Sequence, residues 1–301
     1  MRVLNFGSLN IDHVYQVDHV VRPGETLPSA RYQVFAGGKG ANQSAALALA
    51  GAAVFHAGQV GPEGRWLVAK LAGLGVDMRF TRTGNTPTGH ALIQVDPEGR
   101  NAIVLFPGAN QQLTTAQVDE TLATFGAGDL LLLQNETNLL PHLISQAKES
   151  GLQVCLNPAP FTAAVASYPL DLVDILVVNE IEGEGLSGEA SAAGIAVALA
   201  RRFPATQVVL TLGEHGVIYR SGEVSFSVPA PRVRAVDTTA AGDTFIGYFL
   251  AGLAAGRPLR DAVASATAAA SLAVTRAGAM DSIPGATEVE SWSNGVGRPG
   301  Q

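Results

Sequence analysis

The sequence predicts an α/β protein built around a mostly parallel sheet that helices cover on both faces. Short apolar segments alternate with longer segments of helical periodicity, which is the pattern of parallel strands joined by crossover helices. The 301 residues are 47% hydrophobic and include 34 glycines, which suits a compact enzyme with a large core and many tight turns. No repeat, low-complexity run or flexible linker divides the chain, so we expect residues 1–301 to form a single domain.

The first expected strand spans residues 3–6, and strands and helices alternate regularly from Val54 onward. Further strands are expected at residues 130–133, 154–157, 175–179 and 207–212. Helices are expected at residues 43–50, 66–74, 117–125, 139–150, 191–202 and 245–254. The tail from about residue 291 to residue 301 shows neither pattern, and we expect it to be disordered.

Two segments interrupt the alternation, at about residues 12–36 and 88–106. In each, residues alternate in β fashion on both sides of a turn, as in a β-hairpin. The turns lie at residues 23–26 and 96–99. The two hairpins could pair into one small sheet, which would serve either as a lid or as a dimer interface.

Composition limits the partners that the chain can have. The net charge of −7 gives no reason to expect binding to nucleic acid or to an anionic membrane. Glycine, threonine or charge interrupts the most apolar stretches, so no transmembrane span is expected, and the N-terminus lacks the pattern of a signal peptide. The single cysteine, Cys155, cannot form a disulfide within the chain, and its apolar neighbours indicate a buried thiol. We therefore expect a cytoplasmic protein.

The segment at residues 236–245 carries a strong chemical signal. Small residues and Gly242 lead directly into a long apolar run that indicates a buried helix. These small residues leave the backbone N–H groups of the first turn uncovered, which makes an anion site. Asp243 stands where its carboxylate can face a bound phosphoryl group and deprotonate an attacking hydroxyl. The alternative is that Asp243 merely caps the helix, and this segment by itself leaves both interpretations open.

A second glycine-rich segment, residues 37–42, precedes another expected helix. Its three glycines allow a ligand to approach the backbone closely, while Lys39 and Asn42 add donors and an acceptor suited to sugar hydroxyls. The spacing matches neither a Walker P-loop nor a dinucleotide fingerprint.

Polar residues follow several of the expected strands. The C-terminal ends of parallel strands lie on one edge of a sheet, where α/β folds bind ligands, so these residues should converge there. Asn179 and Glu182 could help to hold a divalent ion through water at this edge. The polar segments are residues 8–12, 134–136, 157–160, 179–182 and 213–216.

Together and in this order, the motifs resemble the signatures of the PfkB family of carbohydrate kinases over about residues 2–284. The matching segments are residues 37–43, 157–160, 179–182, 211–213 and 237–245. The resemblance implies a three-layer α/β/α ribokinase-like fold with a small β-sheet lid. It also implies transfer of the γ-phosphoryl group of ATP to the terminal hydroxyl of a sugar, with D-ribose to ribose 5-phosphate as the expected reaction.

The resemblance further implies roles for individual residues. Asp243 would be the general base, and the amides of Ala240, Ala241, Gly242 and Asp243 would form an anion hole for the transferring phosphoryl group. The implied sugar-binding positions are Asn10, Asp12, Gly38, Lys39, Asn42 and Glu136. The implied nucleotide-binding positions are Asn179, Thr211, Gly213 and Gly216. Glu182 falls on the magnesium-phosphate motif and would act on Mg²⁺ through water.

Two further expectations follow from the family. A potassium ion would activate the enzyme, and its ligand positions, mostly backbone carbonyls, map to Asp237, Thr239, Ala273, Arg276, Gly278 and Ser282. The two hairpins correspond to a lid that closes over the sugar and excludes water. In many members this lid also forms the contact of a homodimer.

Three departures from the family pattern leave the substrate open. Residues 61–64 replace the usual Gly-x-Asp-x-x-Gly, Asn135 precedes Glu136 in place of an apolar residue, and Thr267 stands where relatives often carry His or Asn beside the adenine. A kinase for fructose, 2-keto-3-deoxygluconate or a nucleoside is therefore the alternative, followed by a non-catalytic sugar or nucleotide sensor. A nicotinamide-dependent oxidoreductase is disfavoured because the glycine fingerprint is missing.

Overall fold

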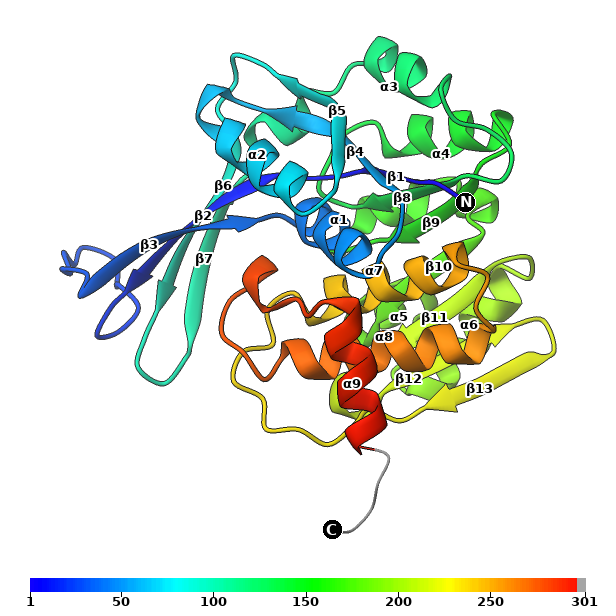
Figure 1. The fold of residues 1–301 in the computed structure, drawn as a ribbon. Coiled ribbons are helices and arrows are strands. Elements are labelled where there is room, and N and C mark those ends of the chain that lie inside the picture. Colours follow the sequence, from blue (N-terminus) through cyan, green and yellow to red (C-terminus); the bar gives the residue numbers. More distant parts are fainter. Residues whose placement is uncertain (297–301) are drawn as a thin grey trace.

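The computed structural model describes residues 1–296 and has a large sheet between two layers of helices, with a small sheet projecting from one side (Figure 1). In the described residues, the large sheet has nine strands in the order β13-β12-β11-β10-β9-β8-β1-β4-β5. The strands from β11 to β5 are parallel, whereas β12 and β13 pair antiparallel at one edge. The predicted fold class is therefore confirmed. The bounds are β1 Val3–Phe6, β4 Val54–Val60, β5 Asp77–Thr83, β8 Leu130–Gln134, β9 Gln153–Asn157, β10 Ile175–Asn179, β11 Gln207–Thr211, β12 Val217–Ser221 and β13 Val224–Val228.

The helices divide into two layers because neighbouring residues of each strand point to opposite faces of the sheet. Leu130 and Leu132 pack with α1, α2, α7, α8 and α9, while Leu131 and Leu133 pack with α3, α4, α5 and α6. Among residues 1–296, no helix combines the length and apolarity needed to cross a membrane. The bounds are α1 Lys39–Leu49, α2 Arg65–Gly73, α3 Thr115–Leu122, α4 Leu140–Glu149, α5 Glu180–Ser187, α6 Ala192–Arg202, α7 Ala241–Ala254, α8 Leu259–Ala273 and α9 Ala286–Val296. Short 3₁₀ helices lie at Pro62–Gly64, Gly108–Gln111, Ala163–Ser167, Leu170–Leu172, Gly213–His215 and Met280–Ser282.

Most of the predicted elements are present, and three expectations need correction. Helices α1 and α7 each begin four residues earlier than predicted, because the small residues taken for loop form the first helical turn. Residues 291–296 belong to α9, so the expectation of disorder is wrong for them, and residues 297–301 lie outside the described residues. The sequence analysis did not place β5, β12, β13, α5 or α8.

The two predicted hairpins pair into one small four-stranded sheet, which we call the lid. Its strands are β2 Asn10–Gln16, β3 Arg31–Gly37, β6 Gly89–Val95 and β7 Asn101–Phe106, in the order β3-β2-β6-β7. Strands β2 and β6 run parallel and join the two hairpins, which confirms the predicted pairing.

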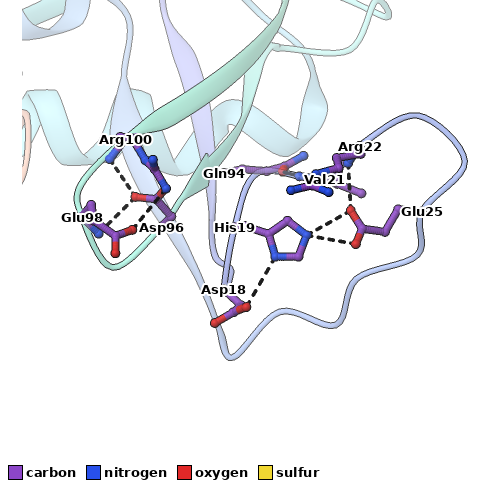
Figure 2. A network of polar contacts seen from close by, with 9 residues as sticks. All are labelled: Asp18, His19, Val21, Arg22, Glu25, Gln94, Asp96, Glu98 and Arg100. Atoms are coloured by element: carbon purple, nitrogen blue, oxygen red, sulfur yellow. Dashed lines mark hydrogen bonds and ion pairs between the residues drawn. The ribbon is translucent and has the colours of Figure 1, made fainter.

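Polar contacts fasten the outer ends of the lid (Figure 2). The amide of Val21 donates to Oε1 of Gln94 at 2.9 Å, which ties the long loop of the first hairpin to the second hairpin. Within that loop, Nε2 of His19 lies 2.9 Å from Oε1 of Glu25. These contacts hold the long loop of the first hairpin in place.

Helices α1 and α7 come from distant parts of the chain and pack closely against each other. A Cβ at Gly247 would stand 2.3 Å from Cβ of Ala46 and 2.8 Å from the amide nitrogen of Leu47, so only glycine fits there. Gly247 lies one turn after Asp243, and Ala46 lies one turn after Gln43. The missing side chain therefore allows the N-terminal turns of the two helices to meet.

Gly247→Ala should destabilise the protein by about 1–3 kcal/mol, because the added methyl group overpacks the contact between α1 and α7. Urea unfolding would measure this loss. Gly73→Ala is the matched control, since Gly73 is helical and, beyond its chain neighbours and its own helix backbone, none of residues 1–296 comes within 4 Å of its Cβ position. The control should be neutral or slightly stabilising. Equal stability of the Gly247→Ala variant and the parent would contradict the close packing.

Candidate active site

The polar residues that follow the parallel strands converge as predicted. Asn157, at the end of β9, accepts from Nε2 of Gln43 at 3.3 Å, and Gln134, at the end of β8, donates to Oε1 of Gln43 at 2.7 Å. Ser8, just after β1, donates its hydroxyl hydrogen to Glu136. Residues from three strand ends thus meet the start of α1 at one edge of the sheet.

The carboxylate of Asp243 is buried between α7 and α1, with only 6% of the residue exposed. Its Oδ2 accepts from Nδ2 of Asn42 at 3.0 Å, and its Oδ1 accepts from Nε2 of Gln43 at 2.9 Å. Its side chain makes no capping hydrogen bond to α7, and the residue at the N-cap is Ala240. The interpretation of Asp243 as a mere helix cap is therefore wrong.

The first turn of α7 presents its amides to open space. Ala240 adopts the left-handed conformation, with φ of 60° and ψ of 10°. Within residues 1–296, the amides of Ala240, Gly242 and Asp243 have no protein acceptor, whereas Ala241 donates to the carbonyl of Thr238 at 3.3 Å. Apart from its chain neighbours and the backbone of its own helix, nothing in the described part of the chain lies within 4 Å of the Cβ position of Gly242. Three of the four predicted amides are thus free to bind an anion.

Two cavities meet at this turn. The larger has a volume of about 750 Å³, and the predicted nucleotide residues Thr211, Gly213 and Gly216 line it together with Thr267. The smaller has a volume of about 220 Å³, and its lining includes Lys39, Asn179, Glu182 and Asp243. Both cavities are lined by Thr211, Thr238, Ala241 and Gly242. A ligand that fills the larger cavity can therefore reach the amides beside Asp243.

Charged groups crowd the other side of the site. The amide of Lys39 donates to Oε2 of Glu136 at 3.0 Å. The negative charge of Asp243, and then that of Glu136, raises the pKa of Lys39 above its usual range despite burial, so its ammonium group stays charged. Burial raises the pKa of Glu136, although the hydroxyl of Ser8 and the charge of Lys39 act against it. Burial and the charge of Glu136 raise the pKa of Asp12 to about 7.

The remaining predicted sugar positions lie next to these groups. Oδ1 of Asn10 accepts from Nδ2 of Asn110 at 2.7 Å. Gly37 faces Asp12 so closely that a Cβ there would stand 2.0 Å from Oδ2 of the carboxylate. Gly38 has φ of 92°, which favours glycine, and forms the N-cap of α1. The glycines thus permit the backbone to pass close to the acidic groups.

Asn179 and Glu182 form a capping box at the start of α5. Oδ1 of Asn179 accepts from the amide of Glu182 at 2.9 Å, and Oε2 of Glu182 accepts from the amide of Asn179 at 3.0 Å. Burial raises the pKa of Glu182, partly offset by the amide of Asn179. In residues 1–296, no group of three or more His, Cys, Asp or Glu residues is arranged to hold a metal ion.

Several of the predicted potassium positions are joined through Asp237. Its Oδ1 accepts from the hydroxyl of Thr239 at 2.6 Å, and its Oδ2 accepts from the amide of Gly278 at 2.9 Å. Burial acts to raise the pKa of Asp237, but these donors outweigh it and hold that pKa below its usual range. The carbonyl of Ala273 accepts from the amide of Arg276 at 3.1 Å, and the hydroxyl of Ser282 donates to Ala279.

The structure shows where the three departures from the family pattern lie. Glu63 accepts from the amide of Thr88 at 2.5 Å, so residues 61–64 support the start of β6. Nδ2 of Asn135 donates to the carbonyl of Pro160 at 2.7 Å, in the loop after β9. Thr267 lines the larger cavity, and its hydroxyl donates to Val263 within its own helix.

The sequence analysis missed the contacts of Gln43, Gln134 and Asn110. Gln43 adjoins Asn42 in the glycine-rich motif, and Gln134 ends a strand. The place of each residue in the sequence therefore indicated that it could lie at the site. Asn110 lies in a short 3₁₀ helix after the lid, where no pattern marks it.

Comparison with known proteins gives the class of this fold and site. A family model described as "pfkB family carbohydrate kinase" matches residues 2–286. The protein is thus a carbohydrate kinase by class, and the resemblance noted in the sequence is confirmed. The chain belongs to the pfkB family. This membership also removes the oxidoreductase alternative.

The chain is similar to several proteins named ribokinase. It is 39% identical to the ribokinase of Haemophilus influenzae over 287 residues, which cover 92% of this chain and 94% of that protein. It is 36% identical to the ribokinase of Staphylococcus aureus, with 96% and 98% covered. The structure of ribokinase from Thermotoga maritima matches with a TM-score of 0.89 at 35% identity and covers 98% of this chain and 99% of that one. The structure of Arabidopsis thaliana ribokinase complexed with ribose and ATP matches with a TM-score of 0.86 at 29% identity, covering 99% of each chain.

Asp12→Asn should remove a loss of stability that the parent suffers as the pH rises. Because the folded-state pKa of Asp12 is raised to about 7, the folded protein binds a proton more tightly than the unfolded chain. The proton on Asp12 therefore stabilises the folded state. This stabilisation is fully present below about pH 4 and is lost as the pH rises through about 7. At pH 8 without ligands, the melting temperature of the variant should exceed that of the parent by about 2–6 °C.

Differential scanning fluorimetry from pH 5 to pH 8 would measure the gap, which should shrink toward pH 5. Asp171→Asn, at an exposed position, is the control and should show no gap that grows with pH. A gap between parent and Asp12→Asn that stays the same at every pH would argue against the buried carboxyl group.

Proposed function

We propose that this protein is an ATP-dependent ribose kinase that transfers the γ-phosphoryl group of ATP to the 5-hydroxyl of D-ribose. The observation that carries the proposal is the carboxylate of Asp243, held by two amide donors beside the open amides of α7. Relatives named ribokinase that cover nearly the whole chain support ribose as the substrate. A similar structure described as complexed with ribose and ATP supports both substrates.

In the proposed reaction, Asp243 takes the proton of the 5-hydroxyl as that oxygen attacks the γ-phosphorus. A bond between the sugar oxygen and phosphorus forms, and the bond from phosphorus to the bridging oxygen breaks, with its electron pair leaving on ADP. The free amides of Ala240, Gly242 and Asp243 would stabilise the charge on the phosphoryl oxygens. The ammonium group of Lys39, which the nearby carboxylates keep charged, adds a positive charge at the same place.

The sugar would lie between α1 and the base of the lid, against Asn10, Asp12, Gly38, Asn42 and Glu136. Within residues 1–296, Oδ1 of Asn42 is buried and accepts no hydrogen bond, so a sugar hydroxyl would satisfy it. Carboxylates that accept from hydroxyls would discriminate against substrates that lack them.

ATP would occupy the larger cavity, with Thr211, Gly213 and Gly216 along its wall and Asn179 near the phosphates. Glu182 fits a divalent ion because it lines the smaller cavity together with Asp243. It would hold Mg²⁺ through water. When bound, Mg²⁺ would neutralise charge on the β- and γ-phosphates.

We propose a potassium site formed by Asp237, Thr239, Ala273, Arg276, Gly278 and Ser282. The residues fit such an ion because Asp237 supplies an ionised carboxylate and the others supply backbone carbonyls, and because the bond from the amide of Gly278 to Asp237 brings the segment before α7 against the segment after α8. Oxygen donors suit a hard cation. The site would adjoin the anion hole, since Asp237 lies three residues before Ala240.

We further propose that the lid forms the contact of a homodimer. Register places Val34, His13, Leu92 and Val104 in one row across the lid, and the three apolar side chains of this row are exposed, Val104 by 67%. An exposed apolar row of this kind is typical of an interaction surface. The site draws on residues from Ser8 to Asp243, which supports one domain, and the need for ATP supports a cytoplasmic location.

Purified protein should phosphorylate D-ribose with a higher kcat/KM than fructose, 2-keto-3-deoxygluconate or nucleosides. A relative named deoxyribokinase, 30% identical, makes 2-deoxyribose a further member of the panel. ADP release in a coupled assay would measure the rates. Asp243→Asn should lower kcat on ribose by at least about 100-fold, because the base is lost, while calorimetry should find ribose binding largely retained.

No ADP release above background with any acceptor would remove the proposed function and favour a non-catalytic sensor. A preference for another acceptor would correct only the substrate. Comparable kcat in Asp243→Asn and the parent would remove the assignment of the base.

Potassium should raise kcat several-fold over the rate in sodium at the same ionic strength, because the smaller ion fits carbonyl ligands spaced for potassium poorly. Asp237→Asn should reduce the difference between the two salts, since the anionic ligand is lost. Rates measured in KCl and NaCl with saturating ribose, ATP and magnesium would check this. Equal rates for the parent in both salts would count against the site.

A further inference from the structure

A buried carboxamide, that of Gln43, holds the carboxylate of Asp243 from the side of the protein core. Gln43 is fully buried, and its Nε2 donates to Oδ1 of Asp243 at 2.9 Å and to Oδ1 of Asn157 at 3.3 Å. Its Oε1 accepts from Nε2 of Gln134 at 2.7 Å. Both polar atoms of the amide are therefore engaged.

The contacts continue away from the site through side chains that are all buried. Nε2 of Gln134 also donates to Oδ1 of Asn5 at 2.9 Å. Nδ2 of Asn5 donates to the hydroxyl of Ser44 at 2.8 Å, and that hydroxyl lies 2.8 Å from Nδ1 of His56. Burial lowers the pKa of His56 to about 4. This row of hydrogen-bonded side chains, which runs from Gln43 to His56, therefore ends in an uncharged group.

The ionised carboxylate fixes the direction of each of these amides. Because Oδ1 of Asp243 can only accept, Gln43 must present its NH₂ group to it and its carbonyl to Gln134. Gln134 must then present its own NH₂ group to Gln43 and to Asn5. If the amide of Gln43 turned over, its oxygen would face the carboxylate, and its NH₂ group would face that of Gln134.

Packing of α1 against α7 does not require the hydrogen bonds of Gln43 to Asp243 and Gln134. Helices α1 and α7 already meet at Gly247 and Ala46, so their close packing does not depend on a polar contact at Gln43. The carbonyl oxygen of Gln134 is buried without a partner in the described part of the chain, so the row carries an energetic penalty. A group that holds the base in one orientation would account for retaining it.

We propose that Gln43 is a positioning residue that orients the carboxylate of Asp243 for proton abstraction, and that Gln134 acts through Gln43 by fixing its amide. The proposal rests on the proposed kinase function, with Asp243 as the base. Asn42 holds the other oxygen, Oδ2, at the sugar side. The two donors together define the plane in which the carboxylate meets the substrate hydroxyl.

Gln43→Leu should lower kcat on ribose by about 10- to 100-fold and change the dissociation constant of ribose by less than about threefold. The acid limb of the pH profile of kcat should move to higher pH, because the ionised base loses a donor. Gln43→Glu keeps the shape but removes the donor and adds a negative charge, so the limb should move further. A purely structural role would lower folding stability and leave the position of this limb unchanged.

Gln134→Leu should lower kcat by a smaller factor, about 3- to 10-fold, because the amide of Gln43 remains but is no longer fixed. The double variant Gln43→Leu/Gln134→Leu should be no slower than Gln43→Leu alone, since Gln134 acts only through Gln43. The matched control is Gln117→Leu, in which the removed glutamine is equally buried but contacts only Gly58 through its side-chain nitrogen. Its kcat and pH profile should equal those of the parent.

Folded Gln43→Leu and Gln43→Glu variants with kcat within twofold of the parent and an unmoved acid limb would overturn the proposal. Losses of the two single variants that multiply in the double variant would overturn the part that concerns Gln134. These outcomes are distinct from a failure of the proposed function, because all of them are read in a parent that phosphorylates ribose. A parent with no kinase activity would reject the proposed function itself.

Discussion

The contact between the first turns of α1 and α7 is the constraint on which the rest of the structure depends. Asn42 and Gln43 on α1 hold the carboxylate of Asp243 on α7, across about 200 positions of sequence. Two features of the structure allow this contact to form. The sheet supports α1 and α7 on one face, and Gly247 lets them approach closely.

The carboxylates near this contact carry more negative charge than the ammonium group of Lys39 can balance. Glu136, Glu182 and Asp243 lie near one ammonium group, that of Lys39, and Asp12 lies near Glu136. Burial raises the pKa of Asp12, Glu136 and Glu182, which means that folding works against their ionisation. Groups that destabilise the free protein in this way are typical of a binding site, because hydroxyl donors or cations brought by ligands can satisfy them.

Sequence reasoning identified the fold class, the lid and the elements that carry the site, and the reason is physical. Strands such as Leu130–Gln134 are apolar throughout because both faces are covered, and the lid hairpins alternate in β fashion around their turns. The starts of α1 and α7 were misjudged because glycine, which favours turns, was taken as loop although Gly40 and Gly242 lie in the first helical turns. The contacts of Gln43 and Gln134 depend on the relative placement of two helices and a strand, which no local pattern encodes.

The lid and the base are connected through the chain as well as through space. Strand β1 ends at Phe6 and β2 begins at Asn10, while β3 ends at Gly37 and α1 begins at Lys39. The first lid hairpin is thus an insertion between the strand at the centre of the site and the helix that holds Asp243. It carries Asn10 and Asp12 at its base, where Gly37 passes against Asp12. A ligand that engages these two residues therefore binds against the end of β3, which pairs with β2 there and leads within a few residues to Asn42 and Gln43, so binding at the lid and orientation of the carboxylate are linked through this strand pairing.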